Sequence, residues 1–198
     1  MTAPDPLTLL ETLTEELTGA GWARQQDPAP GPGNHGPTHR LLVSPDGATH
    51  VHATAYRRHT RLQTTLYGRD PRGDRHPPAW HAGTGALPAS VLIQAARAAV
   101  DPPGASAEAR LLQAGWKLAG CEYEGQRLLE QRWASPDTAR SATFFPADEP
   151  FDSCGWLITR PDQCEPKAQL DASAQTPGAV IAALALHRAV IFTPAFAD

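Results

Sequence analysis

The stretch that decides the fold is Val43-Ser44-Pro45-Asp46, because a close copy of it, Ala134-Ser135-Pro136-Asp137, follows 91 positions later. Each copy is preceded by the same tripeptide, Ala-Gly-Trp, at residues 20–22 and again at residues 114–116. Two different motifs that occur in the same order in each half of the chain predict a structural unit that is used twice.

A helix-forming segment closes each half. The segment of the first half contains Pro88 near its start, and that of the second half contains Pro177, which is a favoured position for proline in a helix. The repeat therefore predicts two units, residues 1–102 and 103–198, of about a hundred residues each. A chain of that size can bury a core of its own.

The residue types in the two copies are those of a tight turn. Proline fixes the backbone at the second turn position, and aspartate accepts hydrogen bonds from nearby backbone amides. We therefore assign structural turn roles to Ser44, Pro45 and Asp46, and to Ser135, Pro136 and Asp137. A nucleophilic serine would need a base and an oxyanion site within reach, and the sequence supplies no recurring histidine for that purpose. We expect no catalytic residues and no enzyme activity.

The hydrophobic pattern predicts the same order of elements in both units. In the first, a helix that begins at Asp5-Pro6 precedes a short strand that starts at Trp22, strands over 40–43, 49–56, 61–67 and 79–82 and a helix over 87–100. In the second, a short helix capped by Ser106 precedes strands over 116–121, 127–134, 139–145, 155–159 and 168–172 and a helix from Thr176-Pro177. The expected fold class is α+β, a tandem repeat of helix, antiparallel sheet of four or five strands, and helix, packed as a pseudo-dimer.

Composition is that of an ordinary globular protein, with 41% hydrophobic and 19% charged residues. The longest apolar run is too short to span a bilayer, and the first residues lack the basic start and apolar segment of a signal peptide. The three cysteines, Cys121, Cys154 and Cys164, lack the spacing of a disulfide framework or a zinc knuckle. We expect a cytoplasmic protein that does not enter a membrane.

The paired signature of Ala-Gly-Trp, Ser-Pro-Asp and a proline-led final helix resembles the SPDY family, an actinobacterial domain of unknown function. The resemblance covers both units, so it implies two tandem copies, and the second copy matches more closely, through Ala114-Gly115-Trp116, Ala134-Ser135-Pro136-Asp137 and Thr176-Pro177. The family name implies an aromatic residue after the aspartate, and Gly47 and Thr138 depart from that pattern. The resemblance implies no activity and no catalytic residues.

An arginine-rich segment is the strongest candidate for a binding surface. Residues 57–76 contain six arginines and two aspartates, a local net charge of +4 in a chain of net charge −4. Basic side chains beside aromatic rings on a sheet are what binding of single-stranded nucleic acid requires, because phosphates are neutralised and bases stack. The candidate binding residues are Arg57, Arg58, His59, Arg61, Tyr67, Arg69, Arg72, Arg75 and Trp80. A solvated hairpin tip is the alternative interpretation of the same segment.

Two further patterns bear on cofactors. Residues 31–36 fit the spacing G-x-G-x-x-G, but no helix pattern follows, so we interpret them as a loop rather than a dinucleotide site. His50 and His52 lie on one face of a predicted strand, and a third zinc ligand would have to be His39, His59 or His81. Solvated histidines on a polar strand face are the preferred explanation of this pattern, and we expect neither a metal nor another cofactor.

The function expected from the sequence is therefore that of a non-catalytic binding or adaptor protein with an unidentified protein partner. By topology alone, the units resemble secretion-chaperone-like folds. The alternative is a single-stranded nucleic-acid-binding protein that acts through the arginine-rich segment, which at the level of topology resembles the Whirly class of single-strand binders.

Overall fold

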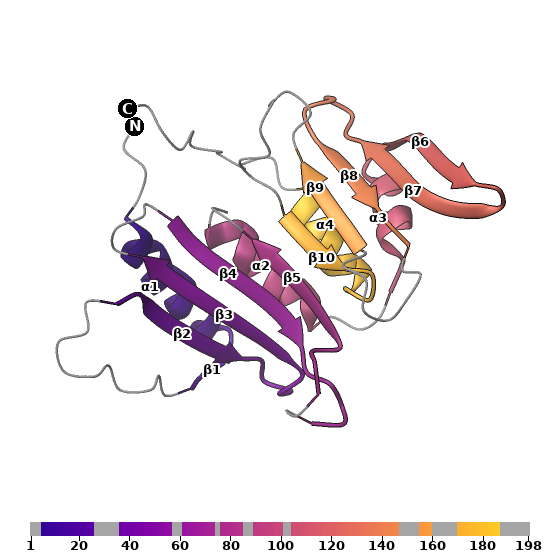
Figure 1. The fold of residues 1–198 in the computed structure, drawn as a ribbon. Helices are drawn as coiled ribbons and strands as arrows, with labels where there is room; N and C mark the ends of the chain where they lie inside the picture. The colour runs from indigo at the N-terminus through magenta and orange to yellow at the C-terminus, as the bar shows by residue number, and fades with distance from the viewer. Residues whose placement is uncertain are drawn as a thin grey trace.

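The computed structural model describes residues 5–25, 36–56, 61–73, 76–84, 89–100, 104–146, 155–159 and 170–186. Within these ranges the chain forms four helices and a single antiparallel sheet of ten strands, which is an α+β fold (Figure 1). The expected fold class is correct at this level.

The first half contains two helices and five strands. Their bounds are α1 Pro6–Gly19, β1 Ala23–Arg24, β2 Thr38–Val43, β3 Thr49–Tyr56, β4 Arg61–Gly68, β5 Trp80–Thr84 and α2 Ala89–Ala99. Asp5 caps α1 by accepting a hydrogen bond from the Thr8 amide, and Pro6 occupies the first turn, as predicted. The strand predicted over 49–56 has the same bounds in the structure.

The second half has the same order of elements. Their bounds are α3 Ala107–Gln113, β6 Lys117–Glu124, β7 Arg127–Ala134, β8 Ser141–Phe144, β9 Gly155–Thr159, β10 Leu170–Ser173 and α4 Gly178–Leu186. Ser106 caps α3, as predicted, and the strands expected over 127–134 and 155–159 keep their bounds. The helical spacing of Val180, Ile181 and Leu184 predicts that His187 shares their face, but His187 lies outside the described residues.

The strand order across the sheet is β1-β2-β3-β4-β5-β10-β9-β8-β7-β6. Each half contributes five adjacent strands, and β5 pairs with β10 at the join through Leu170–Thr84, Asp171–Gly83 and Ala172–Ala82. The last strands of the two halves therefore meet in the middle, which leaves β1 and β6 at the two edges.

All four helices lie against the same face of the sheet (Figure 1). Leu10, Leu13 and Leu17 of α1 are buried there, with Val91 and Leu92 of α2. The second half buries Leu111 of α3 and, on α4, Val180, Ile181 and Leu184. The opposite face, which we call the outer face, carries no helix among the described residues.

Trp22 and Trp116 are core residues at corresponding places. Each is almost fully buried, and each donates its backbone N–H to a leucine carbonyl in the preceding helix, Leu17 for Trp22 and Leu111 for Trp116. This correspondence aligns α3 with the last two turns of α1. The first two turns of α1, residues 6–12, therefore have no counterpart in the second half.

The two Ser-Pro-Asp turns make the same set of hydrogen bonds. The Ser44 hydroxyl donates to the Asp46 carboxylate at 2.5 Å and accepts from the Thr49 amide at 2.9 Å. The Ser135 hydroxyl donates to Asp137 at 2.5 Å and accepts from the Arg140 amide at 3.0 Å. Both serines are buried, so the two side chains satisfy polar groups that water does not reach.

Each turn packs on the glycine of its Ala-Gly-Trp motif. A Cβ atom on Gly21 would lie 3.5 Å from the Pro45 ring, and one on Gly115 would lie 3.4 Å from the Pro136 ring. Both glycines have positive φ, +88° and +82°, where side chains are disfavoured. The two motifs are therefore in contact within each half, which explains why they occur together in the sequence.

Replacement of Ser44 by alanine should lower the free energy of unfolding by about 1–3 kcal/mol, because the buried Thr49 amide loses its acceptor. Ser135→Ala should have a similar effect, since the hydrogen bonds are equivalent. Urea denaturation followed by circular dichroism measures both, with the exposed Ser90→Ala on α2 as a control that should change little. Unchanged stability in both turn variants would contradict the structural role of the serines.

Candidate functional site

The outer face of β2 to β5 is rich in imidazole and phenol rings. Directly opposed residues of antiparallel strands lie on the same face, so the register identifies its members. His50 opposes Tyr67, Tyr67 opposes His81, and Thr54 opposes His39, and none of these positions faces the helices. The strands β2 to β5 contain no aspartate or glutamate. We call the surface formed by His39, His50, His52, Tyr56, Tyr67 and His81 the ring surface.

Several of these rings contact one another. His39 and His52 are stacked, with ring centroids 5.7 Å apart and an angle of 19° between the planes. His50 packs edge-on against Tyr67 at 5.0 Å. The Nδ1 atom of His39 lies within hydrogen-bond distance, 3.1 Å, of the Thr54 hydroxyl. The contacts give the rings defined orientations on a rigid sheet.

The arginine-rich segment does not form one continuous surface on this sheet. Arg61 begins β4, whereas Arg69 and Arg72 follow its other end. At a rise of about 3.3 Å per residue, the eight residues of β4 separate the two groups by roughly 26 Å. Arg57, Arg58, His59 and Arg75 lie outside the described residues, as does the side chain of Arg61. Basic residues that are consecutive in the sequence are thus divided between two ends of a strand.

Arg72 forms an ion pair within its own loop. Its guanidinium donates two hydrogen bonds to Asp70, at 3.0 and 2.8 Å, and its backbone N–H donates a third at 2.7 Å. The Arg72 side chain is the main reason that the pKa of Asp70 falls to about 2. Part of the positive charge that the sequence suggested for a ligand is therefore compensated locally.

Trp80 lies on the other side of the sheet from Tyr67. It opposes Gly68, and a Cβ atom at Gly68 would lie only 2.0 Å from the indole nitrogen. The half-buried ring packs against the core. The structure therefore places Tyr67 beside His50, a residue that the sequence analysis did not include in the binding surface, and separates it from Trp80.

The alternative zinc site requires convergent ligands. Among the described residues, no group of three or more His, Cys, Asp or Glu side chains is arranged to hold a metal ion. His52 stacks on His39, and His50 turns to Tyr67, so the two neighbouring imidazoles have different partners. His59, one of the proposed third ligands, lies outside the described residues.

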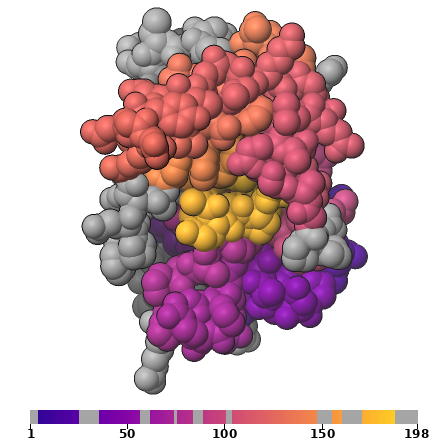
Figure 2. Space-filling view, turned by 90° about the vertical axis from the view of Figure 1, so that its right-hand side faces the viewer, coloured from indigo at the N-terminus to yellow at the C-terminus, as the bar shows by residue number. Residues whose placement is uncertain are grey.

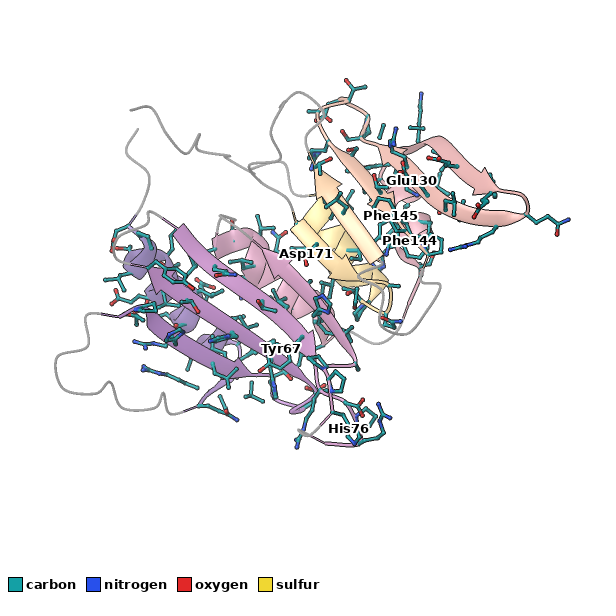
Figure 3. The ribbon with its side chains drawn as sticks, in the orientation of Figure 1. Tyr67, His76, Glu130, Phe144, Phe145 and Asp171 are labelled. Atoms are coloured by element: carbon teal, nitrogen blue, oxygen red, sulfur yellow. The ribbon has the colours of Figure 1, made fainter. Side chains whose placement is uncertain are left out.

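The outer face of the second half has a different character. Asp171 of β10 opposes Gly83, and Glu130 of β7 opposes Glu122 and pairs with Arg132. Figure 3 shows Tyr67, Asp171 and Glu130 on successive parts of the sheet, from β4 through β10 to β7. The strands β2 to β5 thus contribute no carboxylate to the outer face, whereas the strands beyond have mixed charge, and the Asp171 carboxylate borders β5 at Gly83.

Loss of stability in acid should include a contribution from three aspartates. The pKa values of Asp46 and Asp137 are lowered, first by the hydroxyls of Ser44 and Ser135, and that of Asp70 is lowered by Arg72. A lowered pKa in the folded state stabilises the protein above the ordinary value of 3.8, and this contribution disappears as the pH falls toward 2.

Urea denaturation at several pH values tests this interpretation through Asp70→Asn. This variant should be less stable than the natural protein above pH 4, and the difference should shrink as the pH approaches 2. Arg72→Ala should behave in the same way, because it removes the main cause of the shift. A stability difference that stays constant with pH would show that Asp70 has no lowered pKa.

Comparisons with protein-family models, with curated proteins and with solved structures find no match for this chain. The resemblance to the SPDY family therefore stays a prediction from the motifs. Among the described residues, no helix is both long and apolar enough to cross a membrane.

Proposed function

We propose that the protein is a non-catalytic binding protein composed of two tandem SPDY-like repeats that pack as a pseudo-dimer. Support comes from the identical order of elements in residues 1–102 and 103–198 and from the equivalent hydrogen bonds of the two Ser-Pro-Asp turns. The contacts of Gly21 with Pro45 and of Gly115 with Pro136 support the same interpretation. The antiparallel β5–β10 pair is the central contact between the repeats.

The ring surface is the observation that carries the proposed function. It combines stacked and edge-on rings with hydroxyl and amide groups, among them Thr54, Gln63 and Thr65, on strands without a carboxylate. His39 and His52 are exposed to solvent, so their rings are accessible to a ligand. Rings held by a rigid sheet lose little conformational entropy when a planar group stacks on them.

Single-stranded nucleic acid is the ligand class that fits this surface best. Unpaired bases stack on aromatic side chains displayed on a sheet, while phosphates need a surface free of negative charge. The ring surface supplies the rings, its strands contain no carboxylate, and arginines flank both ends of β4. The Asp171 carboxylate of β10 lies at its margin, against Gly83. Duplex DNA is a poorer fit, since its bases are stacked on each other and are not available to the rings.

Fluorescence anisotropy with labelled single-stranded DNA and RNA, at low and then physiological salt, tests the proposal. Binding should be in the micromolar range at low salt and should weaken as salt rises, because contacts with phosphates depend on ionic strength. Tyr67→Ala should weaken binding about tenfold, in line with the loss of one stacked base.

Leu112→Ala is the control, because it truncates an exposed side chain on α3, away from the ring surface. This variant should bind as tightly as the natural protein, and duplex DNA of the same length should bind more weakly than single strands. Absence of binding at low salt, where electrostatic attraction is strongest, would exclude the nucleic-acid function.

An adaptor that holds a partner protein is the second candidate function. The observation that favours it is the edge strand β6, all eight residues of which are exposed to solvent. An exposed strand edge offers unpaired backbone groups to an extended segment of another chain.

A further inference from the structure

The two edges of the sheet differ greatly in length. The edge strand β1 has two residues, whereas β6 has eight, Lys117–Glu124. Proteins usually keep exposed edge strands short or cover them, because the free backbone groups pair readily with another strand. Figure 2, which looks at the molecule from the β6 side, shows the β6–β7 hairpin uncovered in the upper part of the view. The β6 edge therefore has the length and the access that strand pairing requires.

The short helix α3 explains why this hairpin is exposed on the helix side as well. In the first half, α1 has 14 residues, and in the second half α3 has seven, which align with the last two turns of α1. Leu118 and Tyr123 of β6 are 49% and 58% exposed. Large apolar side chains on an edge strand are a feature of strands that pair with another chain.

The side chains of β6 separate into two faces once its bulge is taken into account. The pairing with β7 passes from Leu118–Trp133 to Gly120–Arg132 and thus skips Ala119. Leu118, opposite the buried Trp133, is on the helix side, and so is Cys121, opposite Gln131. The second irregularity of this pairing, between Glu122–Glu130 and Tyr123–Leu128, adds a residue to β7 and not to β6, so Tyr123 is on the helix side with Cys121.

The outer side of β6 carries the charged residues. Lys117 stands at one end of the strand, and Glu122 and Glu124 stand near the other. Gly120 lies between them, opposite Arg132 of β7. The strand therefore carries a lysine at its start and two glutamates at its end, of which Glu124 is exposed and also lies 3.7 Å from the Arg127 guanidinium. Its helix-side row consists of Leu118, Cys121 and Tyr123.

We propose that β6 pairs antiparallel with β6 of a second copy of this chain, with the two-fold axis at Cys121. Residues that oppose each other across the dimer must lie on the same face of the sheet. This condition is met when the bulged Ala119 has no partner, as in the pairing of β6 with β7. In that register Tyr123 opposes Leu118 of the second copy, and Glu124 opposes Lys117 of the second copy. Each of these contacts occurs twice.

The charges at the two ends of β6 favour the antiparallel pair over a parallel pair of the same strands. A parallel β6 pair would place lysine beside lysine and the glutamates beside each other, which is destabilising. A head-to-tail contact between β6 and the other edge would meet β1, which has only two residues in the described part of the chain. The antiparallel β6 pair joins opposite charges at both ends and covers Leu118 and Tyr123. The dimer goes beyond the proposed binding function and does not depend on it.

Light scattering coupled to size-exclusion chromatography, from low to high micromolar concentration, tests the dimer. The natural protein should approach twice its mass of 21.2 kDa. Lys117→Glu and Glu124→Lys should each weaken the dimer about tenfold or more, because each places like charges together at two positions. The double variant Lys117→Glu/Glu124→Lys should regain the dimer, since both ion pairs are restored in reverse.

Glu11→Lys, the same charge change on an exposed position of α1, is the control and should leave the dimer intact. Circular dichroism verifies that each variant is folded. A protein that stays monomeric at every concentration would overturn the proposal and leave the β6 edge to a strand of a different protein. A dimer that resists both single reversals, or a double variant that stays monomeric, would also overturn it.

Cross-linking gives a second measurement that does not depend on charge. In a Cys154→Ser/Cys164→Ser background, a short bis-maleimide should join two copies through Cys121, because the two thiols lie at the axis. A thiol moved to the hairpin end, with Cys121→Ser and Arg127→Cys, should cross-link poorly. Equal cross-linking from both positions would show that copies meet by random collision and would contradict the register.

Discussion

The pairing of β5 with β10 is the contact on which the rest of the molecule depends. Only three residue pairs form it, but they are reinforced by side chains: the His81 amide donates to the Ser173 hydroxyl, and the Thr176 hydroxyl donates to the His81 carbonyl. A Cβ atom on Gly83 would lie 3.0 Å from the Asp171 carboxylate, so a side chain at this position would require that carboxylate to move. This contact turns two five-stranded sheets into one, and it fixes which strands become edges and which face remains without helices.

The two halves have the same order of helices and strands, and they differ in the length of the first helix and of the edge strand. Both keep the turn in contact with the glycine that ends the first helix, and both bury the following tryptophan. The first half adds two helical turns and has almost no edge strand, so its core is covered and its distinctive surface is the ring surface. The second half lacks those turns and extends its edge strand to eight residues, so its distinctive surface is the edge itself. The candidate binding surface of the first half is therefore a sheet face, the ring surface, and that of the second half is a strand edge, β6.

The starts of helices and the positions of several strands could be predicted, because they depend on residues that are close together in the sequence. Asp5-Pro6 and Ser106 begin helices, and alternation along 49–56 gives β3, since capping and burial act within a few residues. The candidate surface was harder to predict because register is not local. The contact of His50 with Tyr67 and the separation of Tyr67 from Trp80 appear only when β3, β4 and β5 are aligned. The arginine-rich segment looked continuous because the sequence does not show that β4 separates its ends.

The geometry of the sheet connects the two proposed surfaces. Neighbouring strands are about 4.8 Å apart, and six steps separate β4 from the β6 edge. In a dimer joined along β6, the two copies of β4 would therefore be thirteen steps apart, a separation of roughly 60 Å. A short single strand would occupy one ring surface at a time, whereas a strand long enough to reach both would gain from the high effective concentration of the second surface. Affinity that rises sharply above a threshold length would then require the dimer, and monomeric variants should lose that rise while they retain the affinity of one surface.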